Sequence, residues 1–295
     1  MKLNVAMTLF AITVIFLANC VWAAEYSTPA SATNIVNSTV TAVKKSSEPS
    51  TGYGISASIT RSSNLIDFKD GSRGDAIDYM IIPTLIFSSG RKISAQISAT
   101  QNLRDEYTNT ENGMNDISVS LSLKPTPLAL AEGWGSKFSY SLTAVVPVSE
   151  YSTKKDQLNT SLSGKVGFSM AQLGQGFSFA SSLSIGRNFH SYEEDINGNI
   201  LNQYSSNQSI NIAYENEGWS ISTDFINRSR WTYQNSTKSS FEISEEVGYA
   251  FNSNISFALG HTNSGATLKP NATDSNIDIY NENSSTVYGT LGLNY

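Results

Sequence analysis

The sequence has 295 residues, of which only 15% are charged, and its net charge is −6 with no basic tract. Nucleic acid is therefore not an expected partner. Beyond the first 25 or so residues no apolar run is long enough for a membrane-spanning helix, which excludes a helical membrane protein. The 14 Tyr and 13 Phe in an otherwise polar chain favour β-structure with one wet face and one apolar face.

The N-terminus has the pattern of an export signal. Lys2 supplies a positive charge, residues 5–17 are apolar, and Val21–Ala23 form a small-x-small cleavage site. We therefore expect residues 1–23 to be a cleaved signal peptide. A lipoprotein signal is the alternative, because Leu17–Cys20 loosely matches a lipobox.

Two further consequences follow for the N-terminal part of the chain. Cys20 is the only cysteine, so cleavage after Ala23 would leave a mature chain without disulfides or thiol chemistry. Residues 24–51 are rich in Ser, Thr, Ala and Asn and lack periodicity, which predicts a disordered periplasmic lead-in.

From Tyr53 onward, apolar residues alternate with small polar ones with a period of two, which is the pattern of a strand with one buried face. Twelve such runs can be counted, and an even number suits a closed barrel with both ends on one side. The predicted strands are residues 53–60, 77–87, 93–100, 117–123, 138–144, 158–170, 177–185, 210–214, 219–225, 241–251, 255–259 and 287–295.

The predicted connections alternate between short and long, as do the periplasmic turns and extracellular loops of outer-membrane barrels. The long ones include residues 188–203 and 262–283, and residues 125–136 are a long exception on the short side. The short ones are residues 88–91, 171–176, 216–218 and 252–254.

Aromatic residues gather at the short-turn ends of the predicted strands, on the face that would meet lipid. This pattern predicts an aromatic girdle at one membrane interface. Tyr79, Trp231 and Phe241 are candidates for the opposite ring. The predicted girdle residues are Tyr53, Phe87, Phe138, Phe168, Phe177, Tyr214, Trp219, Phe251, Phe257 and Tyr295.

The last predicted strand, Val287–Tyr295, alternates apolar positions and ends in an aromatic residue. With the pattern above, residues 52–295 resemble the bacterial outer-membrane β-barrel proteins, and specifically twelve-stranded, porin-like ones. The resemblance implies an all-β fold: a closed antiparallel transmembrane barrel in the outer membrane. It also implies contact with lipid and lipopolysaccharide, and recognition by the barrel-assembly machinery through the C-terminal strand.

The strand parity places mostly serines inside the barrel, so either an open passage or an interior closed by folded-in loops is possible. It also places a charged cluster there. If the loop between the ninth and tenth strands centres on Asn235, Arg228 faces Glu242 and Asp224 faces Glu246. A selectivity constriction and a stiffening salt-bridge network both remain open. The predicted cluster is Asp78, Lys165, Asp224, Arg228, Arg230, Glu242 and Glu246.

Glu245 shares the parity of the lipid-facing residues, where a carboxylate is unfavourable unless it is protonated or covered. A contact with another protein copy and a local bulge are the two explanations that the sequence offers. Glu245 is therefore a possible oligomer contact.

Sites for chemistry are weak in this sequence. His190 and His261 are the only histidines, and His261 with Ser264 only loosely resembles the Ser–His–Asn set of outer-membrane phospholipases. Residues 194–199 resemble a calcium loop but lack its closing glutamate. We therefore expect no metal, cofactor or catalytic residue, and interpret both histidines as rim residues.

The functional hypothesis is a passive channel for small hydrophilic solutes. Similar twelve-stranded barrels include porins for acidic oligosaccharides, but a nearly balanced set of inward charges does not favour that class here. The alternatives are a structural or adhesive barrel that acts through its external loops and, third, an outer-membrane lipid hydrolase.

Overall fold

The computed structural model describes residues 51–65, 74–103, 112–128, 133–171, 173–174 and 176–295. The predicted signal peptide, and the predicted lead-in apart from Thr51, lie outside the described residues. Twelve long strands and two strands of two residues, β4 and β6, form one sheet. No helix among the described residues is long and apolar enough to cross a membrane.

Each of the twelve predicted runs forms one long strand, so the alternation of apolar and polar residues identified them all. The long strands are β1 (Gly52–Asn64), β2 (Asp75–Ile86), β3 (Lys92–Asn102), β5 (Ile117–Ser122), β7 (Ser136–Val146), β8 (Leu158–Met170), β9 (Phe177–His190), β10 (Asn202–Asn216), β11 (Trp219–Thr232), β12 (Thr237–Ala250), β13 (Ile255–Ala266) and β14 (Ser285–Asn294). The short strands β4 (Gly113–Met114) and β6 (Thr126–Pro127) pair with β3 and β7.

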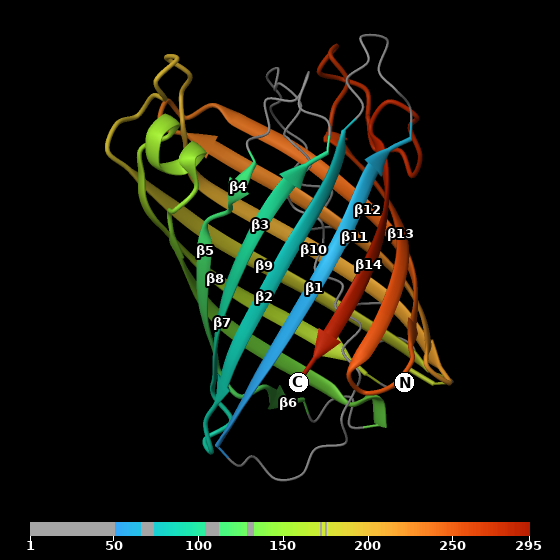
Figure 1. Cartoon of the computed structure of the whole chain (residues 1–295). Coiled ribbons are helices and arrows are strands. Elements are labelled where there is room, and N and C mark those ends of the chain that lie inside the picture. The colour runs from blue at the N-terminus through green and yellow to red at the C-terminus, as the bar shows by residue number, and fades with distance from the viewer. Residues whose placement is uncertain (1–50, 66–73, 104–111, 129–132, 172, 175) are drawn as a thin grey trace.

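The sheet closes on itself. Every strand pairs antiparallel with its neighbours, and β14 pairs with β1, where Ser56 faces Asn294. Beyond the last paired residue, Ile55 and Tyr295 exchange two backbone hydrogen bonds of 2.9 and 2.8 Å. Closure leaves no edge of unpaired N–H and C=O groups, each of which would cost several kcal/mol in hydrocarbon. Figure 1 shows the tilted strands around this closed wall.

The barrel carries its apolar side chains on the outside. Ile81, Leu142 and Leu259 point outward and are 51, 65 and 57% exposed, whereas the inward Ser58 and Thr60 are 8 and 7% exposed. This inside-out distribution is that of a barrel whose outer surface meets lipid.

The predicted alternation of short and long connections is present except between β11 and β12, where residues 233–236 form a short turn at the end of the long loops. The other short turns and the C-terminus share the opposite end of the barrel, which is the periplasmic end in outer-membrane barrels. The tight turns there place Glu217 and Gly218 at positive φ, +50° and +87°. The predicted exception between β5 and β7 is where β6 lies.

Candidate functional site

The inner wall of the barrel is the candidate functional site, and small hydroxyl side chains line it. Their hydroxyls hydrogen-bond across neighbouring strands, so these polar groups of the wall satisfy one another. These cross-strand pairs are Thr60 with Thr290 at 2.9 Å, Ser120 with Thr143 at 2.7 Å and Ser182 with Ser209 at 2.6 Å.

Arg228 of β11 and Glu242 of β12 form an ion pair on this wall, with 2.8 Å between Nη2 and Oε2. Their side chains are only 14 and 6% exposed. The predicted register was wrong, because Arg228 faces Ser240 and Glu242 faces Ile226. The ion pair is therefore diagonal, which two long side chains on neighbouring strands can span.

The predicted pair of facing carboxylates does not form. Asp224 and Glu246 each face a serine, so neither carboxylate lies opposite the other. Asp224 accepts a hydrogen bond of 2.9 Å from Asn211 Nδ2 on β10. Glu246, 6% exposed, accepts one of 3.1 Å from the hydroxyl of Tyr288 on β14. Sequence periodicity did not identify Asn211 or Tyr288 as partners, because these contacts depend on the register between strands.

The remaining members of the predicted cluster are spread around the wall. Asp78 on β2 accepts a hydrogen bond of 2.5 Å from Thr100 on β3. Lys165 on β8 is exposed toward the interior, between serines of β7 and β9. Arg230 is half-buried and faces Lys238 across β11 and β12. The structure therefore pairs Arg228 with Glu242 and keeps Asp224, Arg230 and Glu246 on the same two strands, whereas Asp78 and Lys165 lie elsewhere on the wall.

Glu245 points outward, as its parity predicted, and no bulge interrupts the pairing of β12 with β13. It faces His261, and Glu245 Oε2 lies 3.5 Å from Nδ1 of this histidine. A bulge is therefore wrong as the explanation. The His261 ring also stacks on that of Tyr280, with the centroids 6.0 Å apart.

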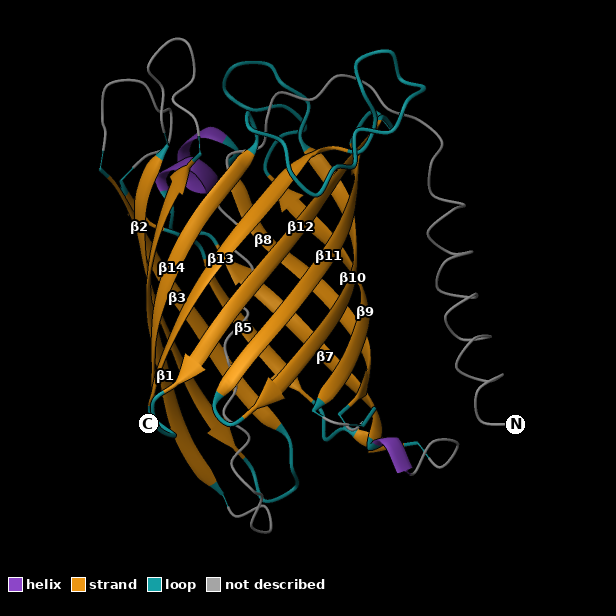
Figure 2. Cartoon of the chain, turned by 90° about the vertical axis from the view of Figure 1, so that its right-hand side faces the viewer, coloured by secondary structure: helices purple, strands orange, loops and turns teal. Residues whose placement is uncertain are grey.

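Tyr280 belongs to the connection between β13 and β14, residues 267–284, which we call the outer strap. The strap covers outward-facing residues of the wall: Phe241 and Asn263 are each 1% exposed. Asn263 Nδ2 donates a hydrogen bond to the carbonyl of Asp278, and Ser284 Oγ donates one to Asn263 Oδ1; each has a length of 2.6 Å. Figure 2 shows loop segments in front of the upper ends of these strands.

The outer strap corrects one sequence prediction. Phe241 was a candidate for the aromatic ring at the extracellular interface, but its 1% exposure keeps it from lipid. Gly265 lies beside it, and a Cβ there would lie 3.5 Å from both the Phe241 ring and the Asn276 amide. Phe241 is therefore packed between the wall and the strap. Tyr79 and Trp231 are exposed at 41 and 36%.

The predicted girdle aromatics all lie at or just beyond the periplasmic strand ends, and several form ring pairs there. Their role at the membrane interface remains a prediction. The ring pairs are Phe138 with Phe168 at 5.6 Å, Phe177 with Tyr214 at 4.9 Å and, including one further residue, Tyr249 with Trp219 at 4.9 Å and with Phe251 at 5.2 Å.

Neither histidine forms a hydrogen bond with a described serine, as the Ser–His pair of a hydrolase would require. His261 points outward with Glu245, whereas Ser264 faces Glu242 on the inner wall. Among the described residues, His261 Nε2 has no hydrogen-bond partner. His190 is the last residue of β9, and its Nδ1 lies 3.3 Å from the hydroxyl oxygen of Tyr233.

The calcium-like segment is an acidic turn that satisfies its own carboxylate. Asp195 Oδ1 accepts hydrogen bonds of 2.8 Å from the backbone N–H groups of Asn197 and Asn199, and Oδ2 accepts one of 2.9 Å from the Asn199 amide. Within the described ranges, no group of three or more His, Cys, Asp or Glu side chains could hold a metal ion.

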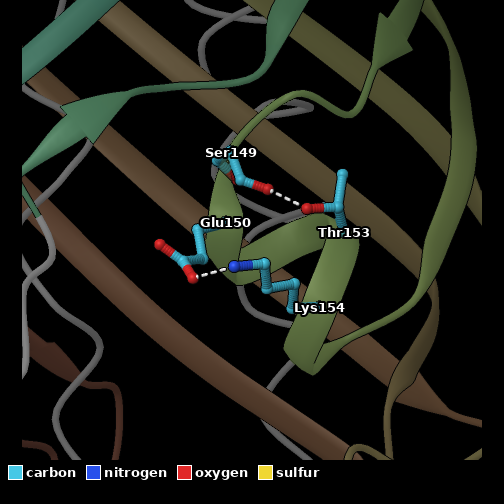
Figure 3. A network of polar contacts seen from close by, with 4 residues as sticks. All are labelled: Ser149, Glu150, Thr153 and Lys154. Carbon is cyan, nitrogen blue, oxygen red and sulfur yellow. Dashed lines mark hydrogen bonds and ion pairs between the residues drawn. The ribbon is translucent and has the colours of Figure 1, made fainter.

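A short π-helix, η2 (Tyr151–Lys155), lies at the extracellular rim between β7 and β8. Lys154 pairs with Glu150, and Thr153 donates a hydrogen bond of 2.7 Å to the carbonyl of Ser149 (Figure 3). These side-chain contacts stabilise the turn, whose backbone is held by hydrogen bonds from Thr153 N–H to the Ser149 carbonyl and from Asp156 N–H to the Tyr151 carbonyl.

Asp116 and Asp156 flank this helix at the rim. Asp116 Oδ1 accepts hydrogen bonds from the Val148 and Ser149 N–H groups at 3.0 and 2.9 Å, so it holds the start of the turn. Burial, with repulsion from Asp195 and Asp116, raises the pKa of Asp156 to about 6.

Comparison with known proteins gives both a family and a fold. The sequence profile of the family described as the MetA-pathway of phenol degradation matches residues 37–214. No match to a curated protein sequence was found. Among solved structures, the chain is similar to the NanC porin, with a TM-score of 0.51 and 11% identity over 82% of this chain and 98% of the porin.

It is also similar to an outer membrane channel from Pseudomonas putida F1. That match has a TM-score of 0.56 and 10% identity, and it covers 84% of this chain and 96% of the channel. At such low identity the likeness concerns the fold, which is the closed antiparallel barrel of outer-membrane proteins.

Proposed function

The chain belongs to the MetA-pathway of phenol degradation family, and from that premise we propose that it is a passive outer-membrane channel for small hydrophilic solutes. The observation that carries the proposal is the contrast between the two faces of the closed barrel. The outer face is apolar, and the inner face is lined by small hydroxyl side chains. Water and small polar solutes are compatible with such a lining.

The similar structures support the same proposal, because one is described as a porin and the other as an outer membrane channel. The family description refers to phenol degradation, but no described feature of the inner wall singles out phenols. The proposed solute is therefore defined by its small size and its polarity.

Conductance of the purified barrel tests the proposal. We expect the full chain, refolded or extracted from outer membranes, to give stepwise single-channel currents in planar lipid bilayers. Proteoliposomes should also swell in small sugars, with rates that fall as the sugar grows. A barrel that is folded, as judged by heat-modifiable mobility in gels, but conducts no ions would overturn the channel proposal.

A non-conducting adhesive barrel is the second candidate, and the extracellular end offers an observation in its favour. The exposed side chains of the outer strap include Ile279 and Tyr280, each 61% exposed, beside the exposed Asp278. Silence in bilayers together with surface binding by the strap would support this candidate.

A further inference from the structure

We propose that the inner wall guides small organic anions, such as monocarboxylates, along a row of basic side chains. This inference rests on the proposed channel function and assigns a solute class to the same wall. The row consists of Lys92, Lys165 and Arg228, which we call the cationic row.

The strand register places these three residues in one continuous line. The line runs from Lys92 on β3 through inward-facing small residues to Lys165 on β8, and then on to Arg228 on β11. Every residue between them carries a hydroxyl or an amide, so hydrogen-bond donors connect the charges. The intervening residues are Ser122 and Ser141, then Ser184 and Asn207.

The line also climbs along the barrel. Lys92 is the first residue of β3, at the periplasmic end. Lys165 lies five residues from the periplasmic end of β8, and Arg228 lies nine residues from that end of β11. Because the strands are tilted against the barrel axis, a line that follows paired residues from strand to strand rises along the wall as a helix. The basic groups therefore follow the direction in which a solute would pass.

The exposed charges on this wall are mainly basic. Lys92 and Lys165 are exposed, and neither forms an ion pair or hydrogen bond with a described side chain. Lys137, also inward and exposed, adds a positive charge at the periplasmic end. Exposed ammonium groups in a confined passage attract anions more strongly than the same groups would in bulk water.

The inward carboxylates, in contrast, are largely covered or partnered. Glu242 and Glu246 are 5 and 6% exposed, the first paired with Arg228 and the second hydrogen-bonded by Tyr288. Asp78 and Asp224 accept hydrogen bonds from Thr100 and Asn211.

Within the described strands, Glu215 is the one inward carboxylate that is exposed, and it lies at the periplasmic end of β10. A nearly balanced set of charges therefore presents an unbalanced surface to the passage, with positive charge predominating.

The extracellular half of the same wall extends the basic surface. Arg230 lies two residues beyond Arg228 on the inward face of β11 and faces Lys238 on β12. Only one of these cations, Arg228, is neutralised by a described carboxylate. An entering carboxylate would thus meet guanidinium and ammonium donors first and could then transfer to Lys165. Carboxylates accept hydrogen bonds from such donors and from hydroxyls alike.

Ion selectivity of the full chain tests this inference. In planar bilayers under a KCl gradient, the reversal potential should show that anions permeate better than cations. With potassium gluconate in place of the chloride salt, current should persist, whereas N-methylglucamine should carry little current. We expect Lys165→Gln to lower the anion-to-cation permeability ratio about threefold, and Lys92→Gln to lower it in the same direction.

The matched control is Lys269→Gln, which removes the same charge from the exposed outer strap and should leave the ratio unchanged. A conducting channel that prefers cations or discriminates nothing would overturn the solute class while the channel function stands. So would an unchanged ratio in Lys165→Gln. A folded wild-type barrel without any conductance would instead overturn the channel function, and this inference with it.

Discussion

Tyr288 of β14 lies across Gly260 of β13 on the inner wall, and a Cβ at position 260 would lie 2.2 Å from the Tyr288 ring. The ring therefore occupies the space that any larger residue would need, and its hydroxyl reaches Glu246 on the next strand. Three neighbouring strands are connected by one aromatic side chain that spans the wall.

Gly260→Ala should consequently displace the tyrosine ring and destabilise the folded barrel. We expect a loss of about 1–3 kcal/mol, the usual range when a well-packed site is overfilled. Heat-modifiable mobility in gels, recorded over a temperature series, measures it. Gly289→Ala is the control, because a Cβ there comes no closer than 3.4 Å to a neighbour. Equal unfolding temperatures for the two variants would contradict the packing argument.

The buried ion pair gives a second prediction. Arg228→Gln leaves the Glu242 carboxylate, 6% exposed, without its counter-charge and should reduce the free energy of unfolding by about 3–5 kcal/mol. The double variant Arg228→Gln with Glu242→Gln removes both charges and should recover much of that loss. Urea unfolding in lipid vesicles gives the values, and a double variant as unstable as the single one would refute the prediction.

The outer strap gives a third prediction. Asn263→Ala removes the side chain that donates to Asp278 and accepts from Ser284, so the strap should detach from the wall. Hydrogen–deuterium exchange of residues 267–284 should become at least tenfold faster, which corresponds to a loss of about 1.4 kcal/mol. Thr262→Ala, on the opposite face of β13, is the control. Unchanged exchange in Asn263→Ala would show that other contacts hold the strap.

The pH dependence of the rim follows from Asp156, whose pKa is raised to about 6 by burial and by its acidic neighbours. A carboxyl with a raised folded-state pKa binds its proton more tightly when folded than when unfolded. The local structure should therefore lose stability as the pH rises from about 4 to about 6, and should then remain constant.

Asp156→Asn should remove this dependence and stabilise the η2 turn at pH 8 by about 1 kcal/mol, a value reduced for partial exposure. Amide exchange of residues 148–157 at pH 4 and pH 8, corrected for the intrinsic rates, measures the effect. Asp274→Asn, at an exposed position, serves for comparison. A stabilisation that is equally large at pH 4 would rule out the proposed titration.

The sequence was sufficient for the strands and their faces because one physical rule, alternation between lipid and interior, acts on every residue of a barrel strand. Register depends on the turn, and there the prediction was wrong. The hairpin of β11 and β12 places Asn235 at a φ of +62°, with its N–H bonded to the Thr232 carbonyl. The turn therefore centres one residue before Asn235, so the residue opposite Arg228 is Ser240 and not Glu242.

Contacts made by long connections could not be predicted from periodicity either. Phe241 and Asn263 have the parity of outward residues, and only the path of the outer strap explains why they are buried. Glu245 is similar: its outward position was predicted, whereas its proximity to His261 required the register of β12 with β13.

The outer strap also alters how the bilayer meets the protein. Where the strap lies against Phe241 and Asn263, acyl chains of the outer leaflet cannot reach the wall, so the belt of strand residues open to lipid is shorter there than the strands alone would make it. A hydrocarbon slab of uniform thickness fits such an uneven belt poorly, and bilayers accommodate a short belt by thinning beside it. We therefore expect a dimple in the membrane next to the strap.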